Sequence, residues 1–554
     1  MKERKLTKKK SQQILATLVM GMNLVNSLAP MAAAMQKLPE QGELQVQKSK
    51  SEAKPLEYTV LPQTFDFVEN IVFSKAEATE YNVESGQTSN IAELSAGDRM
   101  SIGSGGIGSV GKVNAGYQDV KSGGSGVIGT MVTGFQYIST GIGIISTMTS
   151  GWQHISFGGT GTIESMSGGA QYTNSGCTGI VNIMDKGELH VKSGGSGIVD
   201  EMNSGMQNIS AGGSGTVSTM NSGYQWVSSG GIGTVSTMNE GTQYIYNGVG
   251  TVSTMSGGVQ RIYSGGTGTV STMNGGVLEI DYGGTGTIST MNRGTQNISS
   301  GGSGTVSTMN SGYHCVFAGG TGTVNTMNGG MKWVNGGTGT VSTMNGGVQK
   351  VDAGGSGTIS TMSNGNQTIS SGGTGIISIM SGGAQDISSG GKATINDMRG
   401  GIQYVVDAGT GIINSMTSGI QWISFGGTGA VDNMNDGIQY VRAGTGTIIG
   451  MENGIQNVDS GGSGVVGTMN SGIQNISSGG TGTIRTMIDG KQSIFGGGTS
   501  LNTTVYGGSQ YISSGGSVSN TIITGGTQLV LDGASAVNTT LNSGVAEMVF
   551  DTAI

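Results

Sequence analysis

Three histidines and two cysteines are the side chains best suited to metal binding, acid–base catalysis or nucleophilic attack. They are His154, His190, His314, Cys177 and Cys315. In zinc sites such residues follow one another at short, regular spacings in the sequence, and these five residues show no spacing of that kind. We therefore expect three ordinary surface histidines. We predict no catalytic, cofactor-binding or metal-binding residues, and hence no enzyme.

Glycine-rich phrases such as GGTGT at residues 265–269 could in principle hold an ion or a phosphate group. The phrase is similar to the calcium-binding nonapeptide G-G-x-G-x-D, but Val or Ile stands where Asp is needed. Calcium requires several oxygen ligands with charge among them, so we exclude a calcium site. No Gly-Lys-Ser or Gly-Lys-Thr follows, which excludes a nucleotide-binding P-loop.

The same phrase belongs to a unit that recurs through most of the chain. Methionine marks one column of this repeat, at steps of 18 or 17 residues from Met131 to Met487. Numbered from its glycines, the unit reads G-G-T-G-T-V-S-T-M-N-G-G-V-Q-x-I-S-S, with Met at position 9. Val113 and Ser95 continue the column towards the N-terminus, and three aliphatic residues continue it after Met487, which makes 26 repeats. A fixed period of this length indicates a repeat architecture.

Two short runs in each repeat, around TVSTM and VQxIS, are rich in Val, Ile and Thr and lie between Gly and Asn turns. They indicate two β-strands per repeat, whereas the glycine content and the lack of a 3.6-residue pattern exclude helices. Such a small unit buries a core only by stacking on its neighbours. We predict an all-β fold, a single-stranded parallel β-helix (β-solenoid) of about 26 coils of 17–18 residues, over residues 81–550. At ~4.8 Å per coil, the rod is on the order of 120 Å long.

The columns of the repeat predict which side chains face the interior. Ile or Val at position 16 and Met at position 9 are expected to fill the core. Gln at position 14 has the same strand parity as position 16, and two arrangements remain open: a buried ladder of amides along the axis, or amides at a bend that bind backbone carbonyl groups. Cys177 at position 2 and Cys315 at position 15 lie eight coils apart, roughly 40 Å, which predicts two free thiols.

Position 15 has the opposite parity and is expected to face solvent. Aromatic residues recur there, and five of them fall in successive coils as two groups. This predicted contact strip consists of Trp226 and Tyr244, and of Tyr404, Trp422 and Tyr440. Exposed aromatic rings are favoured anchors at interfaces, so the strip is a candidate for binding a glycan or a like molecule. The alternative is that aromatic residues simply suit strands and shield the backbone.

A repeat of this kind could also serve two other functions. A carbohydrate-cleaving solenoid needs paired carboxylates, and between Met131 and Ile494 no two Asp or Glu residues occupy one column of adjacent coils. An ice-binding solenoid needs a flat array of hydroxyl groups, and T-G-T at positions 3 to 5 recurs in several coils. We expect this phrase to form a Gly-rich corner, which is a poor flat surface. A carbohydrate-active or ice-binding solenoid is kept as the alternative function.

The N-terminus has a different character from the repeats. Residues 1–34 combine a basic start, MKERKLTKKK, with a short apolar run and the small residues AAA, which predicts a secretory signal peptide. A membrane anchor is the alternative, but Asn23 and Asn26 interrupt a run that is already short for spanning. Residues 35–80 are predicted to be a linker or a cap on the first coil. The net charge of −8, without a basic patch, makes nucleic acid an unexpected partner.

The final coils, from TSLNTTVYGGSQYISSGGSVSNT to TTLNSGVAEMVF, resemble the repeats of AIDA-type autotransporter adhesins in their NTT, GG-x-Q-x-I and SSGG words. The segment YNVESGQTSNIAELSAGDRMSIGSGG at residues 81–106 is similar to the first coils of such passengers. The resemblance implies an exported, non-catalytic stalk at the cell surface or outer membrane, or secreted, that acts in adhesion, autoaggregation or biofilm formation. It implies as partners like molecules on neighbouring cells, a host surface glycan or protein, and a heptosyltransferase that makes a glycoprotein by modifying Ser and Thr.

One departure from that family concerns its C-terminal translocator barrel. The sequence ends at Ile554, and no run of alternating ten-residue strands with aromatic girdles follows the last coil. We therefore expect either another export route or the product of a truncated or split gene. A truncated, non-functional passenger is thus a further alternative.

Overall fold

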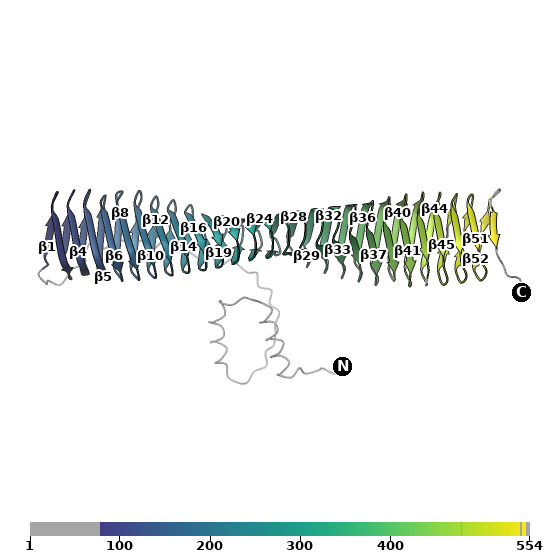
Figure 1. Cartoon of the computed structure of the whole chain (residues 1–554), viewed down its shortest axis with the longest axis horizontal. Helices are drawn as coiled ribbons and strands as arrows, with labels where there is room; N and C mark the ends of the chain where they lie inside the picture. Colours follow the sequence, from purple (N-terminus) through teal and green to yellow (C-terminus); the bar gives the residue numbers. More distant parts are fainter. Residues whose placement is uncertain (1–77, 478, 543–545, 550–554) are drawn as a thin grey trace, which may run out of the picture. The chain divides into compact units, whose positions relative to one another are not determined.

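The computed structural model describes residues 78–477, 479–542 and 546–549. All regular structure in these ranges is β-strand, and 54 strands form one parallel sheet that winds as a stack of about 26 coils (Figure 1). The predicted β-solenoid is therefore confirmed. Because the described residues form strands only, they include no helix that could cross a membrane. The predicted signal peptide and nearly all of the predicted linker lie outside the described residues.

Each regular coil begins with a long strand of seven residues that ends at the methionine of position 9. Its Val, Ile and Thr residues favour extended backbone, and the Gly pair before it and the Asn-Gly turn after it set its limits. The long strands are β6 Ile142–Met148, β8 Thr160–Met166, β10 Thr178–Met184, β12 Ser196–Met202, β14 Ser214–Met220, β16 Ile232–Met238, β18 Val249–Met255, β20 Thr267–Met273, β22 Thr285–Met291, β24 Ser303–Met309, β26 Thr321–Met327, β28 Thr338–Met344, β30 Ser356–Met362, β32 Thr374–Met380, β34 Lys392–Met398, β36 Thr410–Met416, β38 Thr428–Met434, β40 Thr445–Met451, β42 Ser463–Met469 and β44 Thr481–Met487.

A short strand of four or five residues follows in each coil and carries positions 13 to 16. The short strands are β1 Glu80–Val83, β3 Arg99–Ile102, β7 Trp152–Ser156, β9 Ala170–Thr173, β11 Glu188–Val191, β13 Met206–Ile209, β15 Tyr224–Val227, β17 Thr242–Ile245, β19 Val259–Ile262, β21 Val277–Ile280, β23 Thr295–Ile298, β25 Tyr313–Val316, β27 Met331–Asn335, β29 Val348–Asp352, β31 Asn366–Ile369, β33 Ala384–Ile387, β35 Ile402–Val405, β37 Ile420–Ser424, β39 Ile438–Arg442, β41 Ile455–Asp459, β43 Ile473–Ile476, β45 Lys491–Ile494, β48 Ser509–Ile512, β51 Thr527–Val530 and β54 Ala546–Val549.

The coils at the two ends depart from this pattern. Near the N-terminus, β2 Thr88–Leu94 is a separate long strand, whereas β4 Ile107–Val120 and β5 Ser125–Ser139 each join a long and a short segment in one strand. Near the C-terminus, the long strand divides at Asn502, Asn520 and Asn538, which adopt positive φ of 54°, 59° and 56°. The divided strands are β46 Thr499–Leu501, β47 Thr504–Val505, β49 Ser517–Ser519, β50 Ile522–Ile523, β52 Ser535–Val537 and β53 Thr540–Leu541.

Equivalent positions of successive coils pair directly, so the repeat in the sequence becomes the register of the sheet. In β20 and β22, for example, Thr267 pairs with Thr285 and Met273 pairs with Met291. Long strands pair only with long strands and short with short throughout the regular coils. Fidelity of the repeat is therefore a condition for continuous parallel pairing, since a slip of one residue would turn inward side chains outward.

Glycine at position 12 makes the turn between the two strands possible. Gly276 has a φ of 79°, in the left-handed region that other residues rarely adopt. A Cβ atom on Gly276 would also lie 2.7 Å from the carbonyl oxygen of Gly258 in the coil before it. Both the conformation and the close approach of adjacent coils thus require glycine there.

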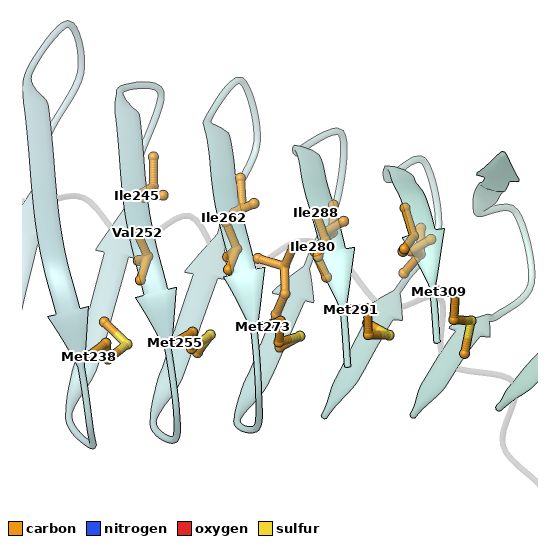
Figure 2. Close-up of a cluster of buried hydrophobic side chains, with 14 of the residues drawn as sticks. Met238, Ile245, Val252, Met255, Ile262, Met273, Ile280, Ile288, Met291 and Met309 are labelled. Atoms are coloured by element: carbon orange, nitrogen blue, oxygen red, sulfur yellow. The ribbon is translucent and has the colours of Figure 1, made fainter. Parts of the chain in front are cut away.

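The core lies between the long and the short strands and runs the length of the stack. The methionines of position 9 are fully buried and follow one another along the axis, as Figure 2 shows for Met238 to Met309. Aliphatic residues at positions 6 and 16, such as Val270 and Ile280, complete the core and are fully buried as well. The prediction that Met and the aliphatic column fill the interior is confirmed.

The glutamines of position 14 form a buried ladder, which confirms the first of the two predicted arrangements. The Nε2 atom donates to the Oε1 atom of the glutamine one coil earlier, at 2.6 Å for Gln439 and 2.7 Å for Gln421. Nε2 of Gln421 also lies 3.3 Å from the carbonyl oxygen of Gly411. The amides therefore satisfy one another along the axis and reach backbone carbonyl groups inside the coils.

Candidate contact surface

The long strands present a face of hydroxyl groups. Positions 3 and 5 point outward because the glycine between them points inward, and the same alternation continues along the strand. Threonines of position 5 follow one another through Thr269, Thr287, Thr305, Thr323, Thr340 and Thr358. We call this outward surface of the long strands the hydroxyl face. The expectation that T-G-T forms a corner is wrong, because the phrase opens the strand, as in β20.

The short strands present a face of a different composition. Positions 13 and 15 point outward and positions 14 and 16 inward, as the burial pattern of β37 shows. All five residues of the predicted contact strip occupy position 15 of this face and are partly exposed. They form two separate groups along the rod, because residues such as Asn297, Thr368 and Asp386 hold position 15 in the coils between them. We call this surface the aromatic–aliphatic face.

The C-terminal group of the strip lies within a larger apolar patch. Trp422 in β37 pairs with Tyr404 in β35 and with Tyr440 in β39, and the Trp422 and Tyr440 ring centroids are 4.9 Å apart. The neighbouring position 13 is isoleucine in these three coils and in the two coils that follow. Its partly exposed residues are Ile402, Ile420, Ile438, Ile455 and Ile473. We call these eight residues the C-terminal patch.

Sequence reasoning missed the aliphatic half of this patch. Position 13 has the same parity as position 15, so the alternation that placed Trp422 outward also places Ile420 outward. Five isoleucines in successive coils are a clear signal once position 13 is followed down the repeat. Sequence reasoning followed only position 15 on this outward side, whereas positions 6, 9 and 16 fill the core and leave position 13 at the surface.

The middle group of the strip gathers additional rings. Trp226 in β15 and Tyr244 in β17 have centroids 4.4 Å apart. Tyr246 stacks on Tyr263 at 4.3 Å with an interplanar angle of 5°, and on Trp226 at 5.6 Å with an angle of 9°. Tyr224, which is 49% exposed, adds a fifth ring. The aromatic cluster is therefore wider than position 15 alone.

A third cluster lies near the N-terminus and involves two of the histidines. Tyr172 stacks on His190 at 4.7 Å with an angle of 7°, and His154 stacks on Tyr137 at 5.2 Å. Partial burial lowers the pKa of both imidazoles below the ordinary histidine value. Above neutral pH these histidines are therefore uncharged rings within an aromatic column.

Stacking fixes how these rings meet a partner. Rings that stack along the rod, such as Tyr246 on Tyr263, cover one another's faces. The rings of Trp422 and Tyr440 are tilted by 37° and therefore do not stack face to face. The surface thus offers stacked and tilted rings, with aliphatic side chains beside them at the C-terminal patch.

The remaining residues with possible chemistry are dispersed. Cys177 and Cys315 are buried and free, which confirms the predicted thiols, and burial raises the pKa of Cys315 to about 11. The expectation of three surface histidines is wrong for His314, which is fully buried in the glutamine column. Nowhere in the described ranges do three His, Cys, Asp or Glu residues gather in a way that could hold a metal ion.

Comparisons with known proteins complete the description. No protein-family model matches the sequence, and no curated protein is similar to it. A solved structure of a hyper-glycosylated fragment of TibA, residues 55–350, whose glycosylation was catalysed by TibC, is similar at 19% sequence identity. The alignment covers 86% of this chain and 94% of that chain, with a TM-score of 0.14.

Proposed function

We propose that this chain is a non-catalytic adhesive stalk, displayed at a cell surface or secreted. It would associate with like molecules on neighbouring cells, or bind a glycan or protein of a host surface. The observation that carries the proposal is the alignment of partly exposed aromatic and aliphatic side chains on one face of the rod. Contiguous apolar surface of this kind marks contact sites, and Trp and Tyr are preferred anchors.

The uniformity of the stack supports the role of a stalk. Long and short strands both pair from coil to coil, and one column of methionines continues through the core. A repeat protein of this kind holds its surface in one extended arrangement and repeats each contact along its length. Weak contacts made by several coils at once then add up to a firm attachment.

A second rod is the partner that the C-terminal patch favours. Three of the five isoleucines share strands with Tyr404, Trp422 and Tyr440, and the other two continue the column in β41 and β43. Aliphatic side chains pack well against another apolar protein surface. Glycans are usually held by aromatic ring faces together with polar groups, which suits the tilted ring of Trp422 better than the stacked ring of Tyr246. We therefore rank self-association above glycan binding.

The proposal includes export of the chain and glycosylation of its Ser and Thr residues. The basic and apolar character of residues 1–34 supports export through a signal peptide. The hydroxyl face supplies many regularly spaced Ser and Thr residues, which suit a heptosyltransferase as acceptors. Mass spectrometry of the natively produced protein tests this part, since each heptose adds a fixed mass to a peptide of a long strand.

Ice binding is the second candidate, and one observation favours it. The T-G-T phrase opens a strand, so the threonines of positions 3 and 5 lie side by side on a regular sheet surface. Methyl and hydroxyl groups at regular spacing on such a surface can order water. Thermal hysteresis of the purified rod would support this function, and its absence at high protein concentration would exclude it.

Bead clumping tests the adhesive function without depending on the export route. Beads coated with the full chain should clump with one another, and beads coated with the Ile420→Ser/Trp422→Ser variant should clump at least tenfold less. The matched control is Ile376→Ser/Ile412→Ser, which makes similar changes at two outward isoleucines of the hydroxyl face. Equal melting temperatures of the variants ensure that the comparison concerns the surface.

Three results separate the partners. Clumping among coated beads indicates self-association, whereas clumping only with glycan-coated or host-protein-coated beads indicates a different partner. Equal clumping of the patch variant and the control variant would show that the C-terminal patch is not the contact surface. No clumping under any of these conditions would contradict the adhesive function.

A further inference from the structure

A lysine occupies the glutamine column in the middle of the rod. Lys332 in β27 holds position 14, points into the core and is fully buried. Its Nζ atom donates to the carbonyl oxygen of Gly322 at 2.9 Å and lies 3.0 Å from Nδ1 of His314 in β25. His314 is also fully buried and holds position 14 of the preceding coil. Two titratable bases therefore replace two successive amides of the ladder.

The ladder is broken around this pair. Gln349, in the next coil, begins a run of amide-to-amide hydrogen bonds that continues to Gln528. On the other side, Oε1 of Gln296 and Nε2 of His314 have no hydrogen-bond partner. The Lys332–His314 pair thus lies at a gap in the axial hydrogen bonding.

No carboxylate faces the pair from the strands packed around it. β25 contributes His314 itself, β26 and β28 contribute the glycines of position 4, and β29 contributes Gln349. Cys315 is a nearby titratable group on the outward side of β25, and its thiol has a raised pKa because it is buried. Asp352 lies on the outward side of β29, where it accepts a hydrogen bond from Trp333.

Burial without a counter-charge keeps both bases neutral in the closed rod. Desolvation lowers the pKa of Lys332 and of His314 well below their ordinary values. A neutral amine donating to Nδ1 leaves the hydrogen of the neutral imidazole on Nε2. A proton on either group would place a charge without a counter-charge in the core, which is strongly unfavourable.

We propose that the Lys332–His314 pair is an acid-sensitive joint at which the coils of β25 to β28 open first when the pH falls, while the coils on either side stay paired. Opening exposes both bases to water, where they take up protons that the closed core excludes. The proposal is independent of the adhesive function, and its test uses no binding measurement.

The direction of the pH effect follows from the lowered pKa values. A base that is neutral when closed and charged when open binds more protons in the open state, so stability is greatest above its ordinary pKa and is lost as the pH falls. While Lys332 is neutral in the closed rod, opening takes up one proton at this residue, which increases the open population about tenfold for each unit by which the pH falls. Below about pH 6.5, the open form of His314 also binds a proton, so the open population then rises more steeply as the pH falls.

Hydrogen–deuterium exchange of the full chain between pH 8 and pH 5 tests the joint. After correction for the intrinsic exchange rates, backbone amides of β25 to β28 should show this increase, and those of β37 to β40 should not. The double variant Lys332→Gln/His314→Gln restores the amide ladder and should abolish the pH dependence. The control Leu278→Gln fills another gap in the ladder and should leave it unchanged.

A single variant keeps the test decisive if the double variant is poorly folded. Lys332→Gln should remove the dependence above pH 6.5 and keep about a tenfold change per unit below it, because His314 remains. A pH-independent exchange of β25 to β28 in the native chain would overturn the proposal. Persistence of the native pH dependence in a folded double variant would overturn it as well.

Discussion

At the scale of single residues, the inward glycine of position 4 is as important as the core side chains that it contacts. A Cβ atom on Gly286 would lie 2.5 Å from Cδ1 of Ile280. Gly286→Ala should therefore destabilise the rod by about 1–3 kcal/mol through overpacking. Gly450 in β40 is the matched control, since its Cβ would meet nothing closer than 3.6 Å. Gly450→Ala should be neutral or stabilising by about 0.5–1 kcal/mol, as measured by chemical denaturation.

Equal losses of stability from the two glycine variants would contradict this account of the interior. A loss only at Gly286 would instead show that space inside the coil, and not the flexibility of glycine, selects the residue at position 4. Neither glycine has a positive φ, so backbone strain does not complicate the comparison.

The glutamine ladder makes a second prediction at this scale. Gln403→Leu leaves Oε1 of Gln385 without its donor and removes one of the acceptors of Nε2 of Gln421, at a cost of about 1–3 kcal/mol. Gln296→Leu is the control, because Oε1 of Gln296 is already unpartnered. Denaturation at pH 8 should show the smaller loss for the control. Indistinguishable losses would indicate that the amides act only as space-filling groups.

The sequence predicted correctly for some residues, and wrongly for others, whether the side chain points into the core or to the surface. Met273 and Ile280 were placed correctly because size and parity agree there. His314 was misplaced because it was judged as a histidine, which is usually exposed, and not as an occupant of the buried position 14. Ile420 was overlooked for the converse reason: its type suggests the interior, whereas its parity places it on the surface.

At the scale of elements, the corners accept changes of length that the strands cannot. Met434 and Met451 are one residue closer than the usual step, and the shortening lies at the corner after Arg442, where Ala443 has a φ of 48°. Insertion of one glycine after Ala443 restores an 18-residue coil and should leave the melting temperature within a few degrees of native. Insertion of one glycine between Thr447 and Ile448, inside β40, should prevent folding of that coil, because it reverses the faces of the strand.

Circular dichroism and limited proteolysis distinguish the two insertions. Cleavage near β40 is expected only for the insertion within the strand. Equal resistance of both variants would mean that register is less strict than the pairing of Met434 with Met451 implies.

Element boundaries show why sequence reasoning placed the T-G-T phrase wrongly. Its glycine was taken as a sign of a corner, whereas Gly286 is an interior strand position where no side chain fits. Glycine has two separate roles in each coil, a positive φ at the turn and an absent side chain in the strand. The sequence shows the same residue type in both roles. The close approach of Ile280 to Gly286 identifies the second role.

At the scale of the whole stack, two faces with different chemistry run along one core. The hydroxyl face suits hydration or modification, and the aromatic–aliphatic face suits contact with another surface. The fold was predictable because the repeat of 17–18 residues specifies both the period and the pairing. The extent of the contact surface was not, because it depends on which outward columns lie side by side across coils, as Ile420 and Trp422 do.

Radical footprinting of the purified full chain tests the central claim most directly. Oxidation of Trp422 and Tyr440 is measured at low concentration, where rods are separate, and at high concentration, where they associate. We predict that association reduces oxidation of both residues severalfold, while Tyr282, which is 74% exposed at a corner, is unchanged. Association that leaves Trp422 and Tyr440 fully reactive would contradict the assignment of the C-terminal patch as the adhesive surface.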